Sequence, residues 1–238
     1  MVTGDLKEEQ VHIIMPVKDS LQTAEEAIRA IVASGYTLTV YDDNSLKENA
    51  TQLDALQDEL GIEVIHVGEH TQHPSPNYRW VLIDAQRVCR EKGLNLVIVE
   101  SDVIVRESTI RRMQETIDSR MGMIAAVTTD KEGVVNFPYE YARKIKADGV
   151  CKKRFSFCCT LLTHELLQAY DFEQLDPTKN WYDVSISHLS QKMGFDNWLQ
   201  VSNPVLHKPH SSRPWKQLKY THPLLYYWRK LTKGLDKI

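Results

Sequence analysis

The chain has 238 residues, of which 42% are apolar and 26% are charged, and its formal net charge is −3. This composition predicts one elaborated globular domain and excludes collagen-like, coiled-coil and wholly disordered chains. Residues 206–238 hold eight Lys or Arg against one Asp, a local charge of +7 that leaves −10 on the rest, which argues against a nucleic-acid groove on the main body and favours an anionic partner for the tail.

Strands and helices are predicted to alternate from the start of the chain. An apolar run at residues 11–15 ends at Pro16, and apolar residues then recur at helical spacing as far as Val32, with Gly35 after them. Residues 36–41 and 62–67 are predicted as two further strands, on either side of a helix over residues 47–60 that Gly61 ends. Three strands that alternate with two helices imply a parallel sheet with right-handed crossovers.

The alternation continues after a loop at residues 70–76 that is dense in His and Pro. Helices are expected over residues 77–92, 107–120, 163–170 and 182–193, and strands or apolar segments over residues 94–99, 103–105, 123–128, 155–162 and 198–201. Residues 130–153 mix Gly, Pro and charges and give no prediction.

The sequence also bears on location. The first ten residues have no apolar run, and no segment approaches the roughly 18 apolar residues that span a bilayer, so we expect neither a secretory signal nor a membrane span. The four cysteines show no CxxC spacing, and none lies near a His at zinc-finger distance. We therefore expect a reduced, cytoplasmic protein without structural zinc.

Acidic residues follow two of the predicted strands. Asp42 and Asp43 end the second, and Glu100 and Asp102 end the fourth, where ligands bind in open α/β sheets. We expect these four carboxylates to face one crevice, although Asp42 and Asp43 could instead turn the chain, and an isolated ExD is more often a solvated loop. Since neither GxxxxGK[ST] nor GxGxxG is present, a divalent cation on the acids is expected to hold a nucleotide diphosphate.

Three motifs, in their order and spacing, resemble the GT-A glycosyltransferases of family 2. They are residues 13–17 (IIMPV), 41–45 (YDDNS) and 99–103 (VESDV), which match a Pro-Val loop, an Asp-Asp-x-Ser motif and a DxD motif. The resemblance implies an α/β GT-A (Rossmann-like) fold with a mostly parallel central sheet flanked by helices. It covers a domain at residues 11–210, with an N-terminal extension at residues 1–10 and a basic aromatic, helical tail at residues 211–238.

The resemblance also implies roles for individual residues. Asp102 would bind the metal, and Arg79 would lie near the base, with a surface salt bridge as its alternative. Asp43 would recognise the base or ribose of the nucleotide sugar, and Glu100 would contact the sugar or ribose. The other residues implied in nucleotide-sugar binding are Pro16, Val17 and Ser101. Glu100 departs from the usual first Asp of the motif, and no Gln-x-x-Arg-Trp motif is present, so a processive polysaccharide synthase is not expected.

The second half of the chain matches the family more loosely. Asp183, within residues 181–186, would be the catalytic base, and its alternative is an acid stabilised by the helix dipole. Tyr182 stands where the family has a further acid. His207 would complete the metal or diphosphate site, and His210 is the competing choice. For each of these two residues, the alternative is a surface His that binds no ligand.

The tail carries Leu224, Leu225, Trp228 and Leu231 at spacings that could form an apolar helical stripe beside basic residues. The preferred interpretation is that the stripe packs on the core of the protein. The alternative is a helix at an anionic membrane surface, near a lipid-linked acceptor.

These features together predict an inverting glycosyltransferase that moves a sugar from a nucleotide-diphosphate sugar, with UDP-sugar favoured, to a hydroxyl of a glycan or lipid-linked acceptor. Mn²⁺ or Mg²⁺ would assist, the role would lie in polysaccharide biosynthesis, and nucleic acid is not an expected partner. The location would be cytoplasmic, with peripheral contact at the inner face of the membrane through the tail. The alternatives are a sugar-phosphate nucleotidyltransferase and a non-catalytic membrane-associated binding module.

Overall fold

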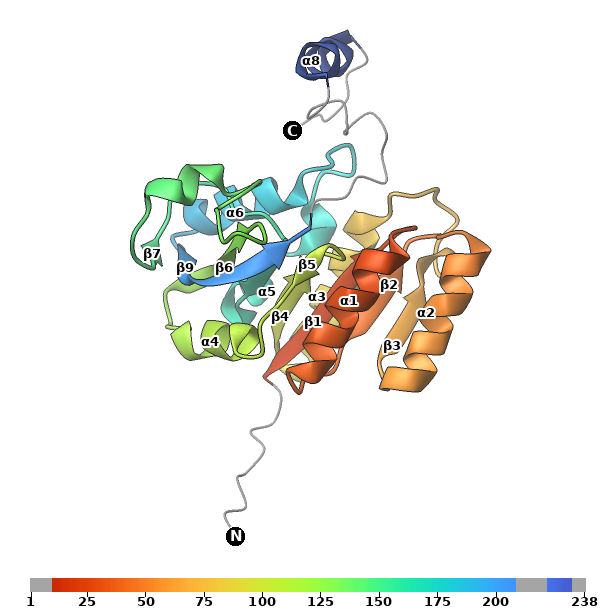
Figure 1. Cartoon of the computed structure of the whole chain (residues 1–238). Coiled ribbons are helices and arrows are strands. Elements are labelled where there is room, and N and C mark those ends of the chain that lie inside the picture. Colours follow the sequence, from red (N-terminus) through yellow and green to blue (C-terminus); the bar gives the residue numbers. More distant parts are fainter. Residues whose placement is uncertain (1–9, 209–221, 233–238) are drawn as a thin grey trace.

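The computed structural model describes residues 10–208 and 222–232. A single sheet runs through it in the order β3-β2-β1-β4-β8-β6-β9-β5, with β7 paired to β9 (Figure 1). Its first half is parallel and contains β1 (Val11–Val17), β2 (Thr39–Asp42), β3 (Glu63–His66) and β4 (Asn95–Val99). The parallel arrangement predicted for these strands is confirmed.

The second half of the sheet is mixed. β8 (Cys159–Leu162) runs antiparallel between β4 and β6 (Met121–Thr129), and β9 (Asp196–His207) is parallel to β6. The two-residue strands β5 (Val103–Ile104) and β7 (Gly149–Val150) pair antiparallel with β9. The start of β8 therefore lies at the same edge of the sheet as the carboxyl ends of β4, β6 and β9.

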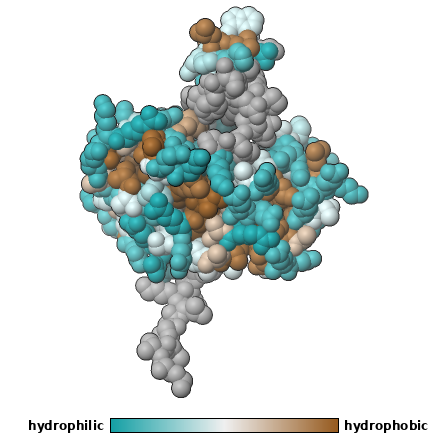
Figure 2. Space-filling view, in the orientation of Figure 1, coloured by the Kyte–Doolittle hydropathy of each residue, from teal (hydrophilic) through white to brown (hydrophobic). Residues whose placement is uncertain are grey.

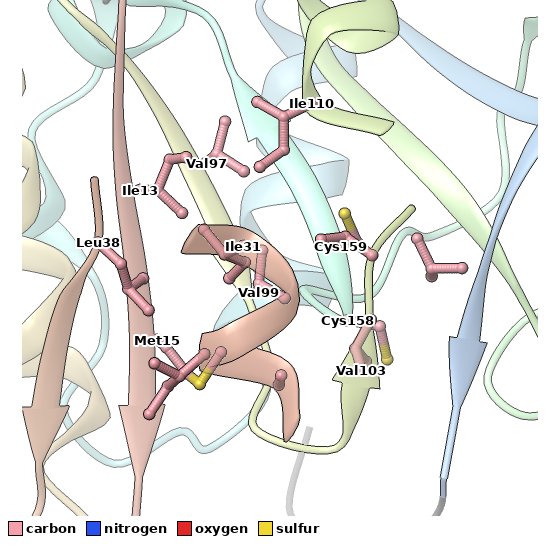
Figure 3. Close-up of a cluster of buried hydrophobic side chains, with 14 of the residues drawn as sticks. Ile13, Met15, Ile31, Leu38, Val97, Val99, Val103, Ile110, Cys158 and Cys159 are labelled. Carbon is pink, nitrogen blue, oxygen red and sulfur yellow. The ribbon is translucent and has the colours of Figure 1, made fainter. Parts of the chain in front are cut away.

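Helices cover both faces of the sheet. α1 (Leu21–Ala33), α2 (Lys47–Leu60) and α4 (Thr109–Thr116) pack on one face, where their apolar residues join one buried cluster. Figure 3 shows part of this cluster, with Ile31 of α1 and Ile110 of α4. α3 (Tyr78–Lys92), α5 (His164–Ala169) and α6 (Tyr182–Lys192) pack on the other. Gly61 and Gly93 end α2 and α3 with φ of 67° and 71°, a left-handed conformation that other residues rarely adopt.

Several elements differ from the prediction. β9 is much longer than residues 198–201 because polar residues within it find partners inside the protein: the Asn203 amide donates to the carbonyl of Thr109 at 3.1 Å. α4 is shorter than expected, and the unpredicted residues 130–153 contain the 3₁₀ helix η2 (Glu140–Lys144) and β7. Two further 3₁₀ helices are η1 (Val67–Glu69) and η3 (Phe172–Gln174).

Helix α8 (Pro223–Thr232) exposes the apolar stripe of the tail. Leu224, Trp228 and Leu231 have exposed fractions of 88%, 62% and 83%, and Figure 2 shows apolar surface on this helix. The expectation that the stripe packs on the core is therefore wrong for the part of the chain that the structure describes, because these side chains are exposed there. In residues 10–208 and 222–232, no helix combines the length and the apolarity needed to cross a membrane.

Candidate functional site

A cavity of about 1410 Å³ opens at the edge where the parallel strands end. Its walls come from both halves of the sheet: the ends of β1, β2 and β4, the loop before α3, the segment before β8 and the start of α6. All nine residues predicted for the site line this cavity, namely Pro16, Val17, Asp43, Arg79, Glu100, Ser101, Asp102, Asp183 and His207. The structure thus brings the predicted residues together, while their individual roles stay predictions.

Pairing of β5 with β9 brings Asp102 and His207 together. β5 follows Asp102 and pairs with the end of β9, so that Val103 lies opposite His207. The amide of Lys208 also donates to the Asp102 carbonyl at 2.8 Å. As a result, Nε2 of His207 lies 3.4 Å from Oδ2 of Asp102, and both residues are buried.

The His207 ring has a fixed orientation. Its Nδ1 donates to the Phe137 carbonyl at 2.7 Å, so Nε2 faces the Asp102 carboxylate. Burial lowers the pKa of His207, but the hydrogen bond and the charge of Asp102 outweigh burial and raise it. In a neutral ring, the Nε2 lone pair would face a carboxylate oxygen, an arrangement that a proton or a divalent cation between them stabilises.

The Asp102–His207 pair therefore fits a metal ion through the chemistry of its two donors. Within the described residues, no group of three or more His, Cys, Asp or Glu side chains is arranged to hold a metal. The protein would thus supply two ligands, and substrate oxygens and water would fill the other positions. His210, the competing choice, lies outside the residues that the structure describes.

Glu100 lies beside this pair at the end of β4. Its N–H donates to the Cys158 carbonyl at 3.0 Å, and the Cys158 thiol donates to its Oε2 at 3.2 Å. Burial, followed by the charge of Asp102, raises the pKa of Glu100 to about 7. Glu100 can therefore donate or accept a hydrogen bond toward a ligand near neutral pH, and the buried Ser101 lines the cavity next to it.

Asp43 anchors the loop that leads into α3. Its Oδ2 accepts from the Ser75 hydroxyl at 2.6 Å and the Asn77 amide N–H at 3.0 Å, and its Oδ1 accepts from the Asn77 side chain at 2.8 Å. Three of about four acceptor positions are thus used within the protein. Its predicted contact with the base or ribose stays a prediction, and anchoring the loop is a role that the motif did not reveal.

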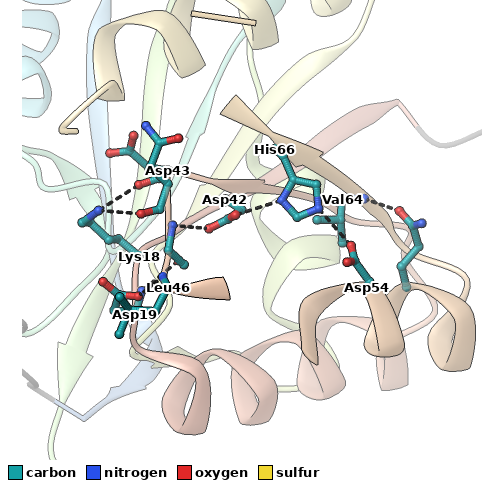
Figure 4. A network of polar contacts seen from close by, with 11 residues as sticks. Lys18, Asp19, Asp42, Asp43, Leu46, Asp54, Val64 and His66 are labelled. Atoms are coloured by element: carbon teal, nitrogen blue, oxygen red, sulfur yellow. Dashed lines mark hydrogen bonds and ion pairs between the residues drawn. The ribbon is translucent and has the colours of Figure 1, made fainter. Parts of the chain in front are cut away.

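Asp42 lies apart from the crevice, which corrects the expectation that four carboxylates face it. Its Oδ2 accepts from His66 Nδ1 at 2.9 Å, while His66 Nε2 donates to Asp54 on α2 at the same distance (Figure 4). The reason is strand geometry, because successive side chains of β2 point to opposite faces. Asp42 therefore stabilises the packing of β3 and α2.

Arg79 connects α3 with the segment after α5. Its Nε donates to the Leu175 carbonyl at 2.9 Å, and its guanidinium also donates to the Glu173 carbonyl. In residues 10–208 and 222–232 these carbonyls are the partners of Arg79, and the surface salt bridge considered for it is not found there. Arg79 still lines the cavity, and its contact with a base stays a prediction.

Asp183 lies in the first turn of α6, which begins after Trp181. Its Oδ1 accepts from the Val184 N–H at 2.8 Å. Burial raises the pKa of Asp183, while the Val184 hydrogen bond and the charge of Arg154 oppose the increase. A carboxylate at the cavity with a raised pKa has the properties of a general base.

Several cavity residues were missed by sequence reasoning. His70 stacks on Trp80 with ring centroids 5.4 Å apart, and Lys18 donates to the carbonyls of Asp43 and Asn44 at 3.1 and 2.9 Å. The loop dense in His and Pro was the only sign of the stacked pair. Arg154 was missed as well, because it follows the stretch for which no structure was predicted.

Solved structures share this architecture, whereas no family model and no curated protein matches the sequence. The mannosyltransferase PcManGT of Pyrobaculum calidifontis, in complex with GDP-Man and Mn²⁺, has a TM-score of 0.63 and 13% identity over 96% of this chain and 66% of its own. TarS of S. aureus has a TM-score of 0.61 and 12% identity, with coverage of 94% and 40%.

GalNAc-T7 with UDP, GalNAc and Mn²⁺ has a TM-score of 0.58 and 12% identity, with coverage of 94% of this chain and 48% of its own. The chain thus spans between 40% and 66% of the length of these three structures. Likeness at this level of identity concerns the fold. It confirms that the chain has the GT-A fold of glycosyltransferases, as the three sequence motifs implied.

Proposed function

We propose that the protein is an inverting glycosyltransferase of the family 2 type, which moves a hexose from a nucleotide-diphosphate sugar, with a UDP-sugar favoured, to an acceptor hydroxyl. The observation that carries this proposal is the buried Asp102–His207 pair, which lies on the same cavity as Asp43 and Asp183. Two solved structures that share the fold hold GDP-Man with Mn²⁺, and UDP and GalNAc with Mn²⁺, which supports glycosyl transfer from such donors.

Asp102 and His207 would hold the divalent ion, which when bound neutralises charge on the diphosphate leaving group. The imidazole favours Mn²⁺ over Mg²⁺, because Mg²⁺ takes oxygen ligands. The Phe137 carbonyl keeps the proton on Nδ1, and this leaves Nε2 of His207 as the ligand atom.

Nucleotide binding would involve the half of the cavity formed by β1, β2, β4 and the loop before α3. Asp43 and Arg79 would contact the base or ribose, and Glu100 the sugar or ribose. Their neighbours in this role would be Pro16, Val17 and Ser101. Because Asp43 already fixes the loop through three hydrogen bonds, this half is preorganised for the donor.

Asp183 would act as the base. It takes the proton of the acceptor hydroxyl while that oxygen forms a bond to the anomeric carbon. The bond from this carbon to the diphosphate breaks on the opposite face, and its electron pair leaves with the diphosphate. The configuration at the anomeric carbon is therefore inverted.

We place the transferase domain at residues 11–210. Its acceptor would be a glycan or a lipid-linked sugar of polysaccharide biosynthesis, on the cytoplasmic side.

The apolar stripe of α8 lies next to Arg229 and Lys230, and α8 contains no acidic residue, so its chemistry suits an anionic bilayer surface. The protein should co-sediment with vesicles of phosphatidylserine and phosphatidylcholine, and the triple variant L224S/W228S/L231S should lose this binding. Equal sedimentation of the variant would exclude membrane contact through α8.

Release of nucleoside diphosphate tests the function. The protein is incubated with a panel of UDP-, GDP- and dTDP-sugars, with and without Mn²⁺, and Asp102→Asn is compared with Asp58→Asn, an exposed acid on α2 that does not line the cavity. We expect metal-dependent turnover that Asp102→Asn lowers by at least about a hundredfold. Pyrophosphate released from nucleoside triphosphate and a sugar phosphate would instead identify a nucleotidyltransferase.

A further inference from the structure

A cation lies against an aromatic ring in the part of the cavity next to α6. The Arg154 Cζ atom is 5.8 Å from the centroid of the Trp181 ring, and both residues line the cavity. Trp181 precedes α6, and Asp183 lies in the first turn of that helix. The charge of Arg154 acts on Asp183, whose pKa it lowers against the effect of burial. Arg154 is thus a positive charge close to the proposed base.

The backbone at Arg154 is held by the surrounding structure. Its carbonyl accepts from the Tyr141 hydroxyl at 2.9 Å, and the N–H of the next residue, Phe155, donates to the Ser187 hydroxyl at 2.8 Å. Phe155 is fully buried. These hydrogen bonds and the packing of Phe155 therefore fix the backbone from which the Arg154 side chain extends.

The guanidinium group of Arg154 keeps its donors for a ligand. Two other cations of the cavity, Lys18 and Arg79, donate to backbone carbonyls. Within the part of the chain that the structure describes, the contact of the Arg154 guanidinium is the Trp181 ring. A cation–π contact uses the charge and leaves the five N–H groups for planar recognition of carboxylate or phosphate.

The charge around Arg154 also differs from that of the main body. Lys152 and Lys153, which precede it, are exposed, and of these three consecutive cations Arg154 lines the cavity, together with the carboxylates of Asp43, Glu100, Asp102 and Asp183. The diphosphate of the donor would be neutralised at Asp102 and His207. An anion that Arg154 binds next to Asp183 would then belong to the molecule whose hydroxyl Asp183 deprotonates.

We propose that the acceptor carries an anionic group, a phosphate or a carboxylate, which Arg154 binds while Trp181 holds the guanidinium in place. This inference rests on the proposed function and names the class of its acceptor. It assigns Arg154 as a residue that determines specificity, through a charge-assisted and bidentate contact.

Pairs of sugars that differ only in an anionic group test the proposal. Methyl glycosides of glucose, galactose and mannose are each compared with the corresponding 6-phosphate and uronic acid, and binding is measured by NMR in the presence of UDP and Mn²⁺. We expect at least one charged form to bind about tenfold or more tightly than its neutral partner. Arg154→Gln should bring that ratio close to one, and Arg154→Lys should keep part of it. Arg111→Gln, a change of an exposed Arg on α4, should keep all of it.

Binding of UDP and GDP with Mn²⁺ is measured separately for each variant, along with thermal unfolding to verify the fold. Failure of the wild type to bind either nucleotide with metal would refute the proposed function. The acceptor proposal is refuted if nucleotide binds but no charged sugar binds more tightly than its neutral partner. It is also refuted if Arg154→Gln weakens nucleotide binding as much as it weakens the charged sugar, because Arg154 would then belong to the donor site.

Discussion

The two halves of the sheet hold their polar side chains in different ways. On the side of β3, β2 and β1, Asp43 and Lys18 make hydrogen bonds of 2.6 to 3.1 Å to protein groups. On the side of β8, β6 and β9, His207 and Asp183 have raised pKa values, and Arg154 contacts an aromatic ring. The first half is thus fixed before any ligand binds, whereas the second keeps groups that a ligand can stabilise.

The largest effect should follow from Asp183→Asn. An amide cannot take the acceptor proton, so we expect kcat to fall by about 10²- to 10⁴-fold while the donor KM changes little. Initial rates of nucleoside diphosphate release measure this change. Since the variant removes a half-buried carboxylate whose pKa is raised, its free energy of unfolding should not decrease. A rate within twofold of the Asp58→Asn control would show that the second half of the sheet does not hold the base.

A smaller and different effect is expected from Asp43→Asn. The new amide cannot accept all the hydrogen bonds from Ser75 and Asn77, so the free energy of unfolding should fall by about 2 kcal/mol. Urea titration measures the loss. If stability were unchanged and only nucleotide affinity fell, Asp43 would be a ligand-binding residue like those of the second half, and the contrast between the halves would fail.

The smallest effect concerns His66, which bridges Asp42 and Asp54. Burial lowers the pKa of His66, but the hydrogen bonds with these two carboxylates outweigh burial and raise it above the ordinary value of 6.5. Its stabilising contribution, about 1 kcal/mol or less, is therefore fully present below pH 6.5 and is lost as the pH rises through the raised pKa. Urea titrations from pH 5.5 to 8.5 should show this loss in the wild type and not in His66→Gln. Parallel curves for the two proteins would contradict it.

Periodic and sharply ended elements were predictable from the sequence. The helix expected over residues 47–60 is observed as α2 (Lys47–Leu60), because Leu53 and Leu56 recur on its buried face and Gly61 ends it. The parallel arrangement of the first strands was predictable from the alternation of strands and helices along the chain. These features depend on local sequence, where spacing and turn chemistry decide the structure.

Features that depend on distant partners were not predictable. Asp42 and Asp43 look equivalent in the sequence, and only His66 on the neighbouring strand shows which of them leaves the cavity. The polar residues of β9 concealed a long strand, because Asn203 finds its partner on α4. The contact between Arg154 and Trp181 was not predictable either, since nothing in the sequence places the two residues side by side.

The β5–β9 contact has a consequence for how the molecule matures. Asp102 precedes β5, and His207 is the last residue of β9, so the two proposed ligands meet only after β9 has docked on β5. A chain still emerging from the ribosome would lack this pair even when its first four strands have folded. Binding of a divalent ion at this pair would therefore require docked β9, and it should slow amide hydrogen exchange in β5 and β9 more than in β2 and β3.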